Sequence, residues 1–403
     1  MSVVITGLGL MSPHGDDPQA LIGALLRGES AVREVFEGQL PKPAAAATVT
    51  FDESRWFTKL QLPGVDRVSQ LAVAAADLAF KDAGSPAGLD AERLGVYAGC
   101  GMGGGAAIES AYLAGLAGGR VPPLTIPAFM PNAPASHVAM RHGAKGPVLT
   151  YSVACASSAV ALGEAMRAVQ RGDVDMAIAG GSEALIVPGV VAAWQAMQTL
   201  ASFTPGEAAR ACRPFAADRS GFVLGEGAAF MVLETEAHAR ARGARIHARL
   251  VGYGLSSDAT HLTKPDPAGQ ARSLRGALRE AGLSPSDVGY CNAHGTATKI
   301  GDLVECEALA GVWGPALAQL KVSSTKALHG HLLGAAGALE AVVTVLALQQ
   351  QQVPPNLHGA RVEPACTLNL VTPGDTAAPS LQAAVSSSFA FGGTNAVLAF
   401  TRA

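Results

Sequence analysis

Residues Gly146–Arg171 read GPVLTYSVACASSAVALGEAMRAVQR. The first part, up to Val153, is rich in β-forming residues, and the stretch from Ser157 to Gln170 consists of helix formers. The sequence therefore predicts a strand, a tight elbow of small residues and a helix, with Cys155 at the elbow.

A thiol at a helix N-terminus faces unpaired backbone N–H groups and the positive end of the helix dipole. Both features stabilise a thiolate, so the pattern predicts a lowered pKa for Cys155 and a role as nucleophile. The alternative is an inert, buried cysteine, which is the common state of free cysteines. Motifs further along the chain decide between these two interpretations.

The same pattern recurs in the second half of the chain. Residues 322–348 read VSSTKALHGHLLGAAGALEAVVTVLAL, where a strand over Gln319–Ser323 is expected to lead into a helix from about His331 to Gln350. Strands alternate with helices throughout, which is typical of α/β proteins with largely parallel sheets covered on both faces. We expect two similar halves, residues 1–244 and 245–403, whose equivalent loops meet at one site.

The composition is that of a closely packed protein. The 403 residues are 49% hydrophobic and 15% charged, and they include 47 glycines. A net charge of −3 argues against bulk attraction to nucleic acid or to an anionic membrane. The most apolar predicted helix, Leu332–Leu348, carries Glu340 near its middle, so we expect no membrane span.

The cysteine pattern and the first residues bear on the cellular compartment. The six cysteines include no CxxC pair, which argues against a zinc site or a thioredoxin-type site. The chain opens directly into a predicted strand, Val3–Thr6, without the charged and apolar regions of a secretory signal. These patterns predict a location in the reducing cytoplasm.

Two glycine motifs invite nucleotide-binding interpretations that the sequence does not support. After Gly7-x-Gly9, the third glycine position holds Ser12, and Pro13 follows where a helix would be running. The run Gly99–Gly105 lacks the Lys-Ser/Thr pair of a phosphate-binding loop. We expect a tight turn at the first motif and close chain packing at the second.

Three short loops in the second half carry residues that can do chemistry. They read NAHGTAT (292–298), STKALHGH (324–331) and SFAFGGTN (388–395). Asp302 and Glu305 follow the first loop and are predicted to cap the next helix. Any one loop has an ordinary structural explanation, but together with Cys155 they indicate an active site.

The four segments VACASS, NAHGTAT, STKALHGHLLGAAGALE and FAFGGTN, in this order and spacing, resemble the signature set of β-ketoacyl-[acyl carrier protein] synthases. The resemblance covers essentially the whole chain, and it is to the elongating condensing enzymes with a Cys-His-His site. It implies the thiolase fold, a five-layer αβαβα sandwich of two pseudo-repeated α/β halves. This agrees with the repeat seen in the sequence.

The resemblance also implies roles for individual residues. Cys155 would be the nucleophile that accepts the acyl chain, and the other implied residues are the catalytic His294, His331, Lys326 and Phe391, the supporting Glu340, Asp302 and Glu305, and the substrate-binding Thr296, Thr298 and Ile108. Ile108 is the expected floor of the acyl pocket. His329 matches no position of the motif and is given no role.

The implied reaction explains these residue types. A thiolate attacks an acyl thioester, and backbone N–H groups of Cys155 and Phe391 hold the oxyanion. A malonyl thioester then loses CO2, and two neutral imidazoles donate to the enolate oxygen. We expect no metal or redox cofactor, substrates carried on the phosphopantetheine of acyl carrier protein, and a dimer.

Some features depart from the family pattern. The family usually has glycine where Ala390 stands, and a methyl group there is expected to stiffen the gate formed by Phe391. The segment from Glu37 to Leu62 matches poorly, so the residues offered for carrier docking are candidates only: Lys59, Arg67, Arg210 and Arg213.

Several alternatives stay open. The pathway is either fatty-acid elongation or polyketide and polyene synthesis, and the dimer consists of either identical or related chains. A non-catalytic chain-length subunit of this fold would lack the nucleophile, whereas Cys155 and both histidines are present. A thiol hydrolase would use Cys and His but has no role for a second histidine or for Lys326.

Overall fold

The computed structural model describes residues 2–86, 88–359 and 361–403. Eleven strands form one sheet in the order β12-β11-β10-β13-β14-β9-β1-β8-β6-β4-β5. The strands of the first half of the chain are β1 (Val3–Met11), β4 (Leu94–Gly99), β5 (Val148–Tyr151), β6 (Met176–Glu183) and β8 (Gly227–Thr235). Those of the second half are β9 (Ala248–Ser257), β10 (Tyr290–Asn292), β11 (Lys321–Ser323), β12 (Asn369–Leu370), β13 (Ala383–Phe389) and β14 (Thr394–Arg402).

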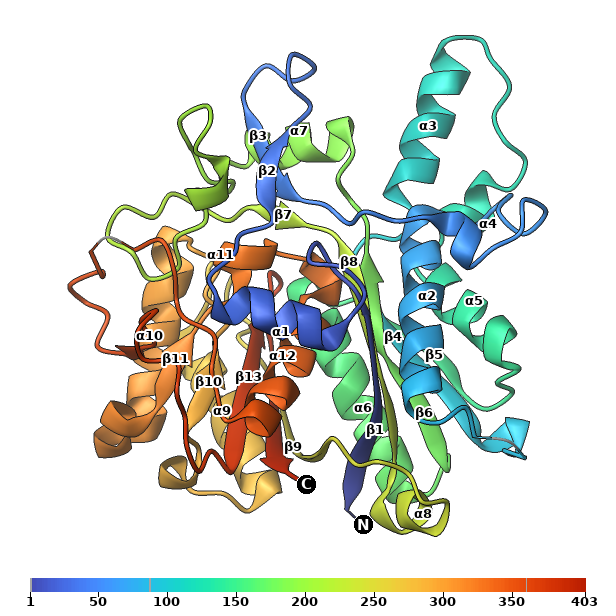
Figure 1. Ribbon diagram of the computed structural model, residues 1–403. Helices are drawn as coiled ribbons and strands as arrows, with labels where there is room; N and C mark the ends of the chain where they lie inside the picture. The colour runs from blue at the N-terminus through green and yellow to red at the C-terminus, as the bar shows by residue number, and fades with distance from the viewer. Residues whose placement is uncertain (1, 87, 360) are drawn as a thin grey trace.

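Among the described residues, the two halves of the main sheet are joined through the pairing of β1 with β9. Strand β1 pairs with β9 from Val3 opposite Leu250 to Ile5 opposite Ala248. On either side of this junction the sheet halves diverge and enclose two helices, α6 (Ser157–Arg171) and α12 (Ala336–Gln350), which pack against each other and against strands of both halves. The outer faces are covered by α2 (Arg67–Asp82) and α5 (Ala133–His142) on one side and by α9 (Pro267–Ala281) and α10 (Lys299–Trp313) on the other (Figure 1).

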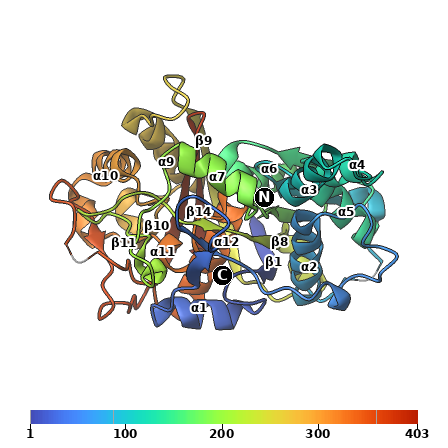
Figure 2. The same ribbon diagram turned by 90° about the horizontal axis from the view of Figure 1, so that it is seen from above.

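These layers make the five-layer αβαβα arrangement that the resemblance implies, and Figure 2 shows the same order from above. The pseudo-repeat extends to the elbows before the central helices. The short 3-10 helices η3 (Ala154–Ala156) and η7 (Leu333–Ala335) precede α6 and α12, and each begins with a non-glycine residue at positive φ, Ala154 at 49° and Leu333 at 47°. This backbone conformation is uncommon for such residues, so both halves use the same strained turn.

Small residues let the central helices approach closely. A Cβ added at Gly337 of α12 would lie 2.8 Å from Ala159 Cβ of α6, so only glycine fits there. The stretch Leu333–Gln350 is long and apolar enough to cross a membrane, but 89% of it is buried inside the structure. It is therefore the core helix of the sandwich.

The remaining elements lie around this core. They are the helices α1 (Pro18–Leu26), α3 (Gly105–Leu116), α4 (Thr125–Phe129), α7 (Pro188–Ala196), α8 (Glu236–Ala241) and α11 (Lys326–His329), and the small sheet β2 (Val32–Val35), β3 (Ala44–Ala47) and β7 (Leu224–Gly225). Single-turn 3-10 helices lie at Glu53–Arg55, Ala91–Arg93, Ala208–Arg210 and Pro285–Asp287, and a longer one at Gly314–Gln319.

The expectation of largely parallel sheets was wrong for the centre of the sheet. Strands β4, β5 and β6 are parallel, as are β10 to β13, but β1, β8, β9 and β14 run antiparallel to their neighbours. The antiparallel pair β13–β14 is joined by a tight turn, which needs no crossover helix.

Candidate active site

Cys155 lies at the elbow between β5 and α6, as the sequence predicts. The elbow is fixed by Ser157, whose Oγ accepts from Val153 N (3.0 Å) and donates to Ala154 O (2.6 Å). Cys155 is 8% exposed, and burial raises the pKa of its thiol to about 11. The predicted lowering was wrong, because the loss of hydration outweighs the nearby Lys326 charge and the backbone N–H groups that favour the thiolate.

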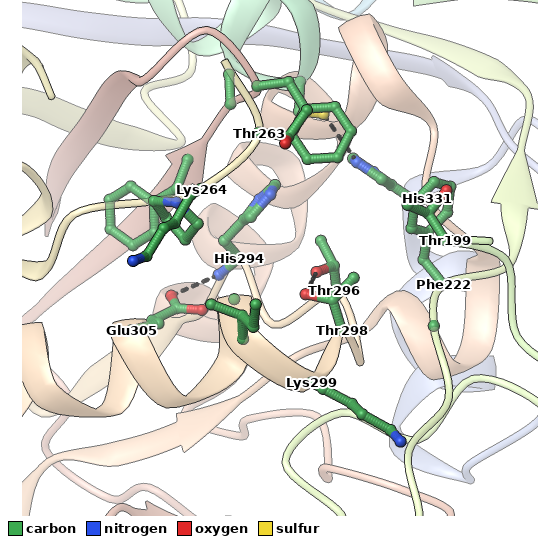
Figure 3. Close-up of a pocket in the computed structure, with 18 of the residues that line it drawn as sticks. Thr199, Phe222, Thr263, Lys264, His294, Thr296, Thr298, Lys299, Glu305 and His331 are labelled. Carbon is green, nitrogen blue, oxygen red and sulfur yellow. Dashed lines mark hydrogen bonds between the residues drawn. The ribbon is translucent and has the colours of Figure 1, made fainter. Parts of the chain in front are cut away.

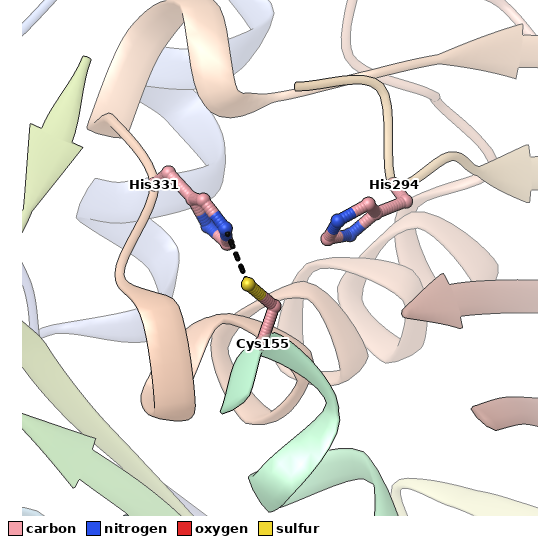
Figure 4. Close-up of side chains that lie close together, drawn as sticks. All are labelled: Cys155, His294 and His331. Carbon is pink, nitrogen blue, oxygen red and sulfur yellow. Dashed lines mark hydrogen bonds between the residues drawn. The ribbon is translucent and has the colours of Figure 1, made fainter. Parts of the chain in front are cut away.

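Both predicted histidines reach this thiol from the second half of the chain. His331 Nε2 lies 3.1 Å from Cys155 Sγ, and the His294 ring is 5.5 Å from the His331 ring at 83° (Figure 4). Burial, with the Lys326 cation as the next cause, holds the pKa of each imidazole well below its usual range. Both rings are therefore neutral at physiological pH, as donation to an enolate requires.

The loop that carries His294 is held by hydrogen bonds to a buried carboxylate, that of Glu305. Glu305 accepts from His294 N (2.8 Å), Gly295 N (2.7 Å) and Ser387 Oγ (2.9 Å). Burial raises the pKa of Glu305, and these donors oppose that effect. The Gly295 carbonyl is held from the other side by Ser324 Oγ at 2.6 Å.

The predicted helix cap at Asp302 and Glu305 was wrong. Helix α10 already begins at Lys299, with Thr298 at its N-cap, so both carboxylates lie inside the helix and point into the core. Asp302 accepts from Phe215 N at 2.7 Å. The pair supports the His294 loop and its surroundings rather than the start of the helix.

Lys326 and Glu340 form an ion pair that is fully excluded from solvent. Burial raises the pKa of Glu340 to about 7, and the Lys326 ammonium opposes the shift. After burial, this ammonium is the next cause at each active-site group: it opposes the rise in the pKa of Cys155 and adds to the lowering of the pKa of His294 and His331. His329 is not among the residues that line the cavity, and its ring nitrogens lie 2.8 Å from Thr325 Oγ1 and 2.8 Å from Gly330 O, which suits a structural role.

A cavity of about 530 Å³ is lined by Cys155, His294 and His331 and opens to the surface. Thr296 and Thr298 line it with their hydroxyls 3.1 Å apart (Figure 3). The exposed Lys264 and Lys299 stand among the lining residues. The lining of the cavity thus runs from exposed polar residues to the buried Cys155, His294 and His331.

Aromatic rings line one wall of this cavity. Trp194 of α7 packs on Phe222 (5.4 Å) and on Phe391 (6.3 Å), and Phe222 in turn meets the His331 ring edge-on at 5.4 Å. Neither Trp194 nor Phe222 was singled out from the sequence, since nothing in the local pattern marks them. They form a continuous apolar contact between Phe391, the expected gate, and the His331 ring.

Ala390, the departure from the family pattern, fits the observed turn. Its φ is not positive, whereas Gly392 (88°) and Gly393 (78°) take the left-handed region. Its N–H donates to Thr394 O at 2.8 Å, and Gly392 N donates to Leu262 O at 2.7 Å. The effect of the methyl group on gate motion stays a prediction.

The structure does not bring every predicted residue to the cavity. Ile108 lies on α3, 37% exposed, and does not line the cavity. Among the docking candidates, Arg67 is bound to Glu226 at 2.7 Å and Arg213 to Asp218 at 2.8 Å, whereas Lys59 and Arg210 remain candidates on exposed segments.

One buried carboxylate was missed. Glu183, at the end of β6, accepts from Gly101 N (2.8 Å) and from Gly334 N (3.0 Å), directly after the His331 turn. Burial raises its pKa to about 7. The signal in the sequence was an acidic residue closing an otherwise apolar strand.

Cys155, His294 and His331 also have the spacing of a possible metal site. The ligand atoms of Cys155, His294 and His331 lie within 4.8 Å of one another, and thiolate with imidazole is a donor set that zinc accepts. The expectation that no metal is used therefore stays a prediction.

Comparison with known proteins agrees with this geometry. Residues 1–239 match the family model "Beta-ketoacyl synthase, N-terminal domain", and residues 247–360 match "Beta-ketoacyl synthase, C-terminal domain". The chain is 39% identical to 3-oxoacyl-[acyl-carrier-protein] synthase 2 of Staphylococcus aureus (strain COL) over 99% of this chain and 98% of that one. It is 41% identical to Nodulation protein E of Rhizobium meliloti, with the same coverage.

A solved structure described as the ishigamide ketosynthase/chain length factor superposes with a TM-score of 0.92 and 31% identity, covering 100% of this chain and 99% of that one. Sequence and structural matches thus both extend over the whole chain. The chain belongs to the beta-ketoacyl synthase family of condensing acyltransferases.

Proposed function

We propose that this chain is a 3-oxoacyl-[acyl carrier protein] synthase that elongates a Cys155-bound acyl chain by decarboxylative condensation with a malonyl thioester. The observation that carries this proposal is the convergence of one thiol and two neutral imidazoles in a single cavity. A hydrolase would need only one imidazole beside the thiol.

In the first half-reaction, the Cys155 sulfur attacks the acyl thioester carbonyl. The Cys155 and Phe391 N–H groups face the sulfur, and we assign them as donors to the oxyanion that forms beside it. The C–S bond to pantetheine breaks, and the departing sulfur takes up the proton that Cys155 loses. The net charge of the buried site is unchanged, which suits a site where charge is costly.

In the second half-reaction, a malonyl thioester occupies the same cavity, with its pantetheine arm beside Thr296 and Thr298. Loss of CO2 leaves an enolate, whose oxygen accepts from the Nε2–H groups of His294 and His331. The enolate carbon attacks the acyl carbonyl and Cys155 leaves as thiolate. Burial, with the Lys326 ammonium as the next cause, keeps both imidazoles neutral, and the same ammonium supports the returning thiolate.

We infer that acyl carrier protein delivers both substrates on phosphopantetheine, as the name of the Staphylococcus aureus relative indicates for that enzyme. The cavity suits such an arm, because its lining includes both exposed residues, such as Lys264 and Lys299, and the buried Cys155. We propose no further cofactor. The pathway is either fatty-acid or polyketide synthesis. We propose that the protein is located in the cytoplasm. We also propose that the chain divides into its two similar halves near residue 244.

We also propose a dimer. Large apolar side chains are exposed on α3, α4 and the edge strand β5, among them Tyr112 (66%), Leu116 (70%), Ile126 (64%) and Leu149 (45%). An apolar patch beside an unpaired strand edge is normally covered by another chain. Ile108 lies on the same helix, so its expected role as pocket floor would be completed in the dimer.

The partner is either an identical chain or a related chain length factor, as in the ishigamide structure. Mass measurement in solution tests the assembly, and a stable monomer would contradict it. Ile108→Phe tests the pocket floor, since product length unchanged by that variant would remove the assignment.

Product analysis tests the reaction itself. Purified protein, with its co-expressed partner if one is required, is incubated with an acyl carrier protein thioester and malonyl carrier protein. We expect a 3-oxoacyl carrier protein two carbons longer, together with CO2. Release of free fatty acid without a longer product would identify a thioester hydrolase instead.

A further inference from the structure

Two cysteines outside the active site lie with their sulfur atoms in contact. Cys306 is in the middle of α10 and is 3% exposed, whereas Cys366 is half-buried on the segment before β12. Their Sγ atoms are 3.1 Å apart, although the residues are 60 positions apart in the sequence. A disulfide bond is about 2.05 Å long, so the sulfurs are about 1 Å from bonding distance.

The backbone around both sulfurs is held in place. Cys366 N donates to Glu363 O at 2.8 Å, and the Glu363 carboxylate binds the buried Arg219 at 2.8 Å. Arg219 also donates to Thr298 O at 3.0 Å, at the start of the helix that carries Cys306. The surface segment and the helix are therefore tied together by contacts independent of the thiols.

We propose that Cys306 and Cys366 form a reversible disulfide when the protein meets a peroxide or a small-molecule disulfide, at a modification site separate from Cys155. Disulfides are rare in reducing compartments, and those that form there are usually transient. The two thiols differ in a way that fits ordered oxidation. Cys366 is the more accessible, and the Cys306 S–H hydrogen bond lowers the pKa of Cys366 while raising that of Cys306.

With hydrogen peroxide, the Cys366 thiolate attacks one oxygen and the O–O bond breaks, which gives a sulfenic acid and hydroxide. The Cys306 sulfur then attacks the Cys366 sulfur and the S–O bond breaks. The hydroxyl group that leaves Cys366 takes up the proton of the Cys306 thiol and departs as water. In total, two thiols lose two electrons and two protons, and one peroxide becomes two waters.

The bond should form without disturbing the active site. Cys306 is adjacent to Glu305, which holds the His294 loop. Helix α10, which carries Cys306, is fixed by its packing against α9. Cys366, in contrast, lies on a half-buried segment that is freer to move. The shift of about 1 Å therefore falls on the Cys366 side. Closing a loop of this length restricts the unfolded chain, so the oxidised protein should melt at a higher temperature.

The test uses the Cys155→Ala variant of the full chain, which removes the catalytic thiol as a competing target. Folded protein is treated with hydrogen peroxide or with oxidised glutathione, alkylated and digested with trypsin. We expect peptides 300–321 and 362–402, each with one cysteine, to be linked, with a loss of 2 Da and a melting temperature higher by several degrees. Reduction should reverse both changes.

Cys306→Ser and Cys366→Ser should each abolish the link and the rise in melting temperature. Cys291→Ser is the matched control, since Cys291 is fully buried in the same core, and it should leave both intact. If Cys306 and Cys366 are both still thiols after oxidation of the folded protein, and are therefore both found alkylated, the proposal is overturned. A stable glutathione adduct on Cys366 with Cys306 unreacted would also overturn it.

Discussion

The substitution Glu305→Gln should weaken the support of the His294 loop while leaving the reactivity of the Cys155 thiol almost unchanged. The carboxylate accepts three buried hydrogen bonds, from His294 N at 2.8 Å, Gly295 N at 2.7 Å and Ser387 Oγ at 2.9 Å. Glutamine keeps one oxygen and places an amide NH2 where the other oxygen stood. At least one backbone N–H then faces a donor, which costs about 1.5–3 kcal/mol.

This loss falls on the loop that positions His294 and leaves the Cys155 elbow untouched. A misplacement of a catalytic group by about 1 Å costs on the order of 10²-fold in rate, so we expect malonyl decarboxylation to fall about 10- to 100-fold. Acylation of Cys155 should change only a few-fold. The free energy of unfolding should fall by about 2 kcal/mol.

The assay follows CO2 release and covalent acylation separately, with circular dichroism to confirm folding. Glu307→Gln, two residues further along α10 and exposed, is the matched control and should behave as the parent chain. An equal loss of both half-reactions in folded Glu305→Gln would refute the reasoning, as would unchanged decarboxylation.

His294→Ala and His331→Ala should each lower decarboxylation by roughly 10² while some acylation persists; near-normal CO2 release from both would exclude the enolate assignment. Lys326→Met leaves a carboxylate unpaired in the core, so unfolding should become about 3–5 kcal/mol easier, and a variant of parental stability in denaturant titration would contradict the ion pair. Because burial raises the pKa of Cys155 to about 11, its alkylation by iodoacetamide should keep accelerating up to pH 10, and a plateau near pH 7 would indicate a preformed thiolate instead.

Local pattern predicted the elements that carry the site. The strand, elbow and helix around Cys155 were expected and confirmed, as was the equivalent turn before α12, because small residues and helix formers act over a few positions. The repeat indicated two similar halves, and the five layers were implied by the resemblance to the condensing enzymes. The antiparallel centre of the sheet was not expected, since strand direction depends on which distant segments pair.

Features that depend on burial could not be obtained from the sequence. The helix N-terminus favours a lowered thiol pKa at Cys155, yet the desolvation that dominates is set by residues packed from the other half of the chain. Asp302 and Glu305 had the spacing of a helix cap but serve as buried acceptors. The contact between Cys306 and Cys366 has no signature in their spacing.

The most direct test of the central claim is the intact mass of the protein after incubation with an acyl carrier protein thioester alone. The account predicts one acyl group per chain, located on Cys155 by peptide mapping and absent from Cys155→Ala. Addition of malonyl carrier protein should discharge it as the 3-oxoacyl product. An acyl group that persists in Cys155→Ala, or one that maps to another residue, would contradict the account.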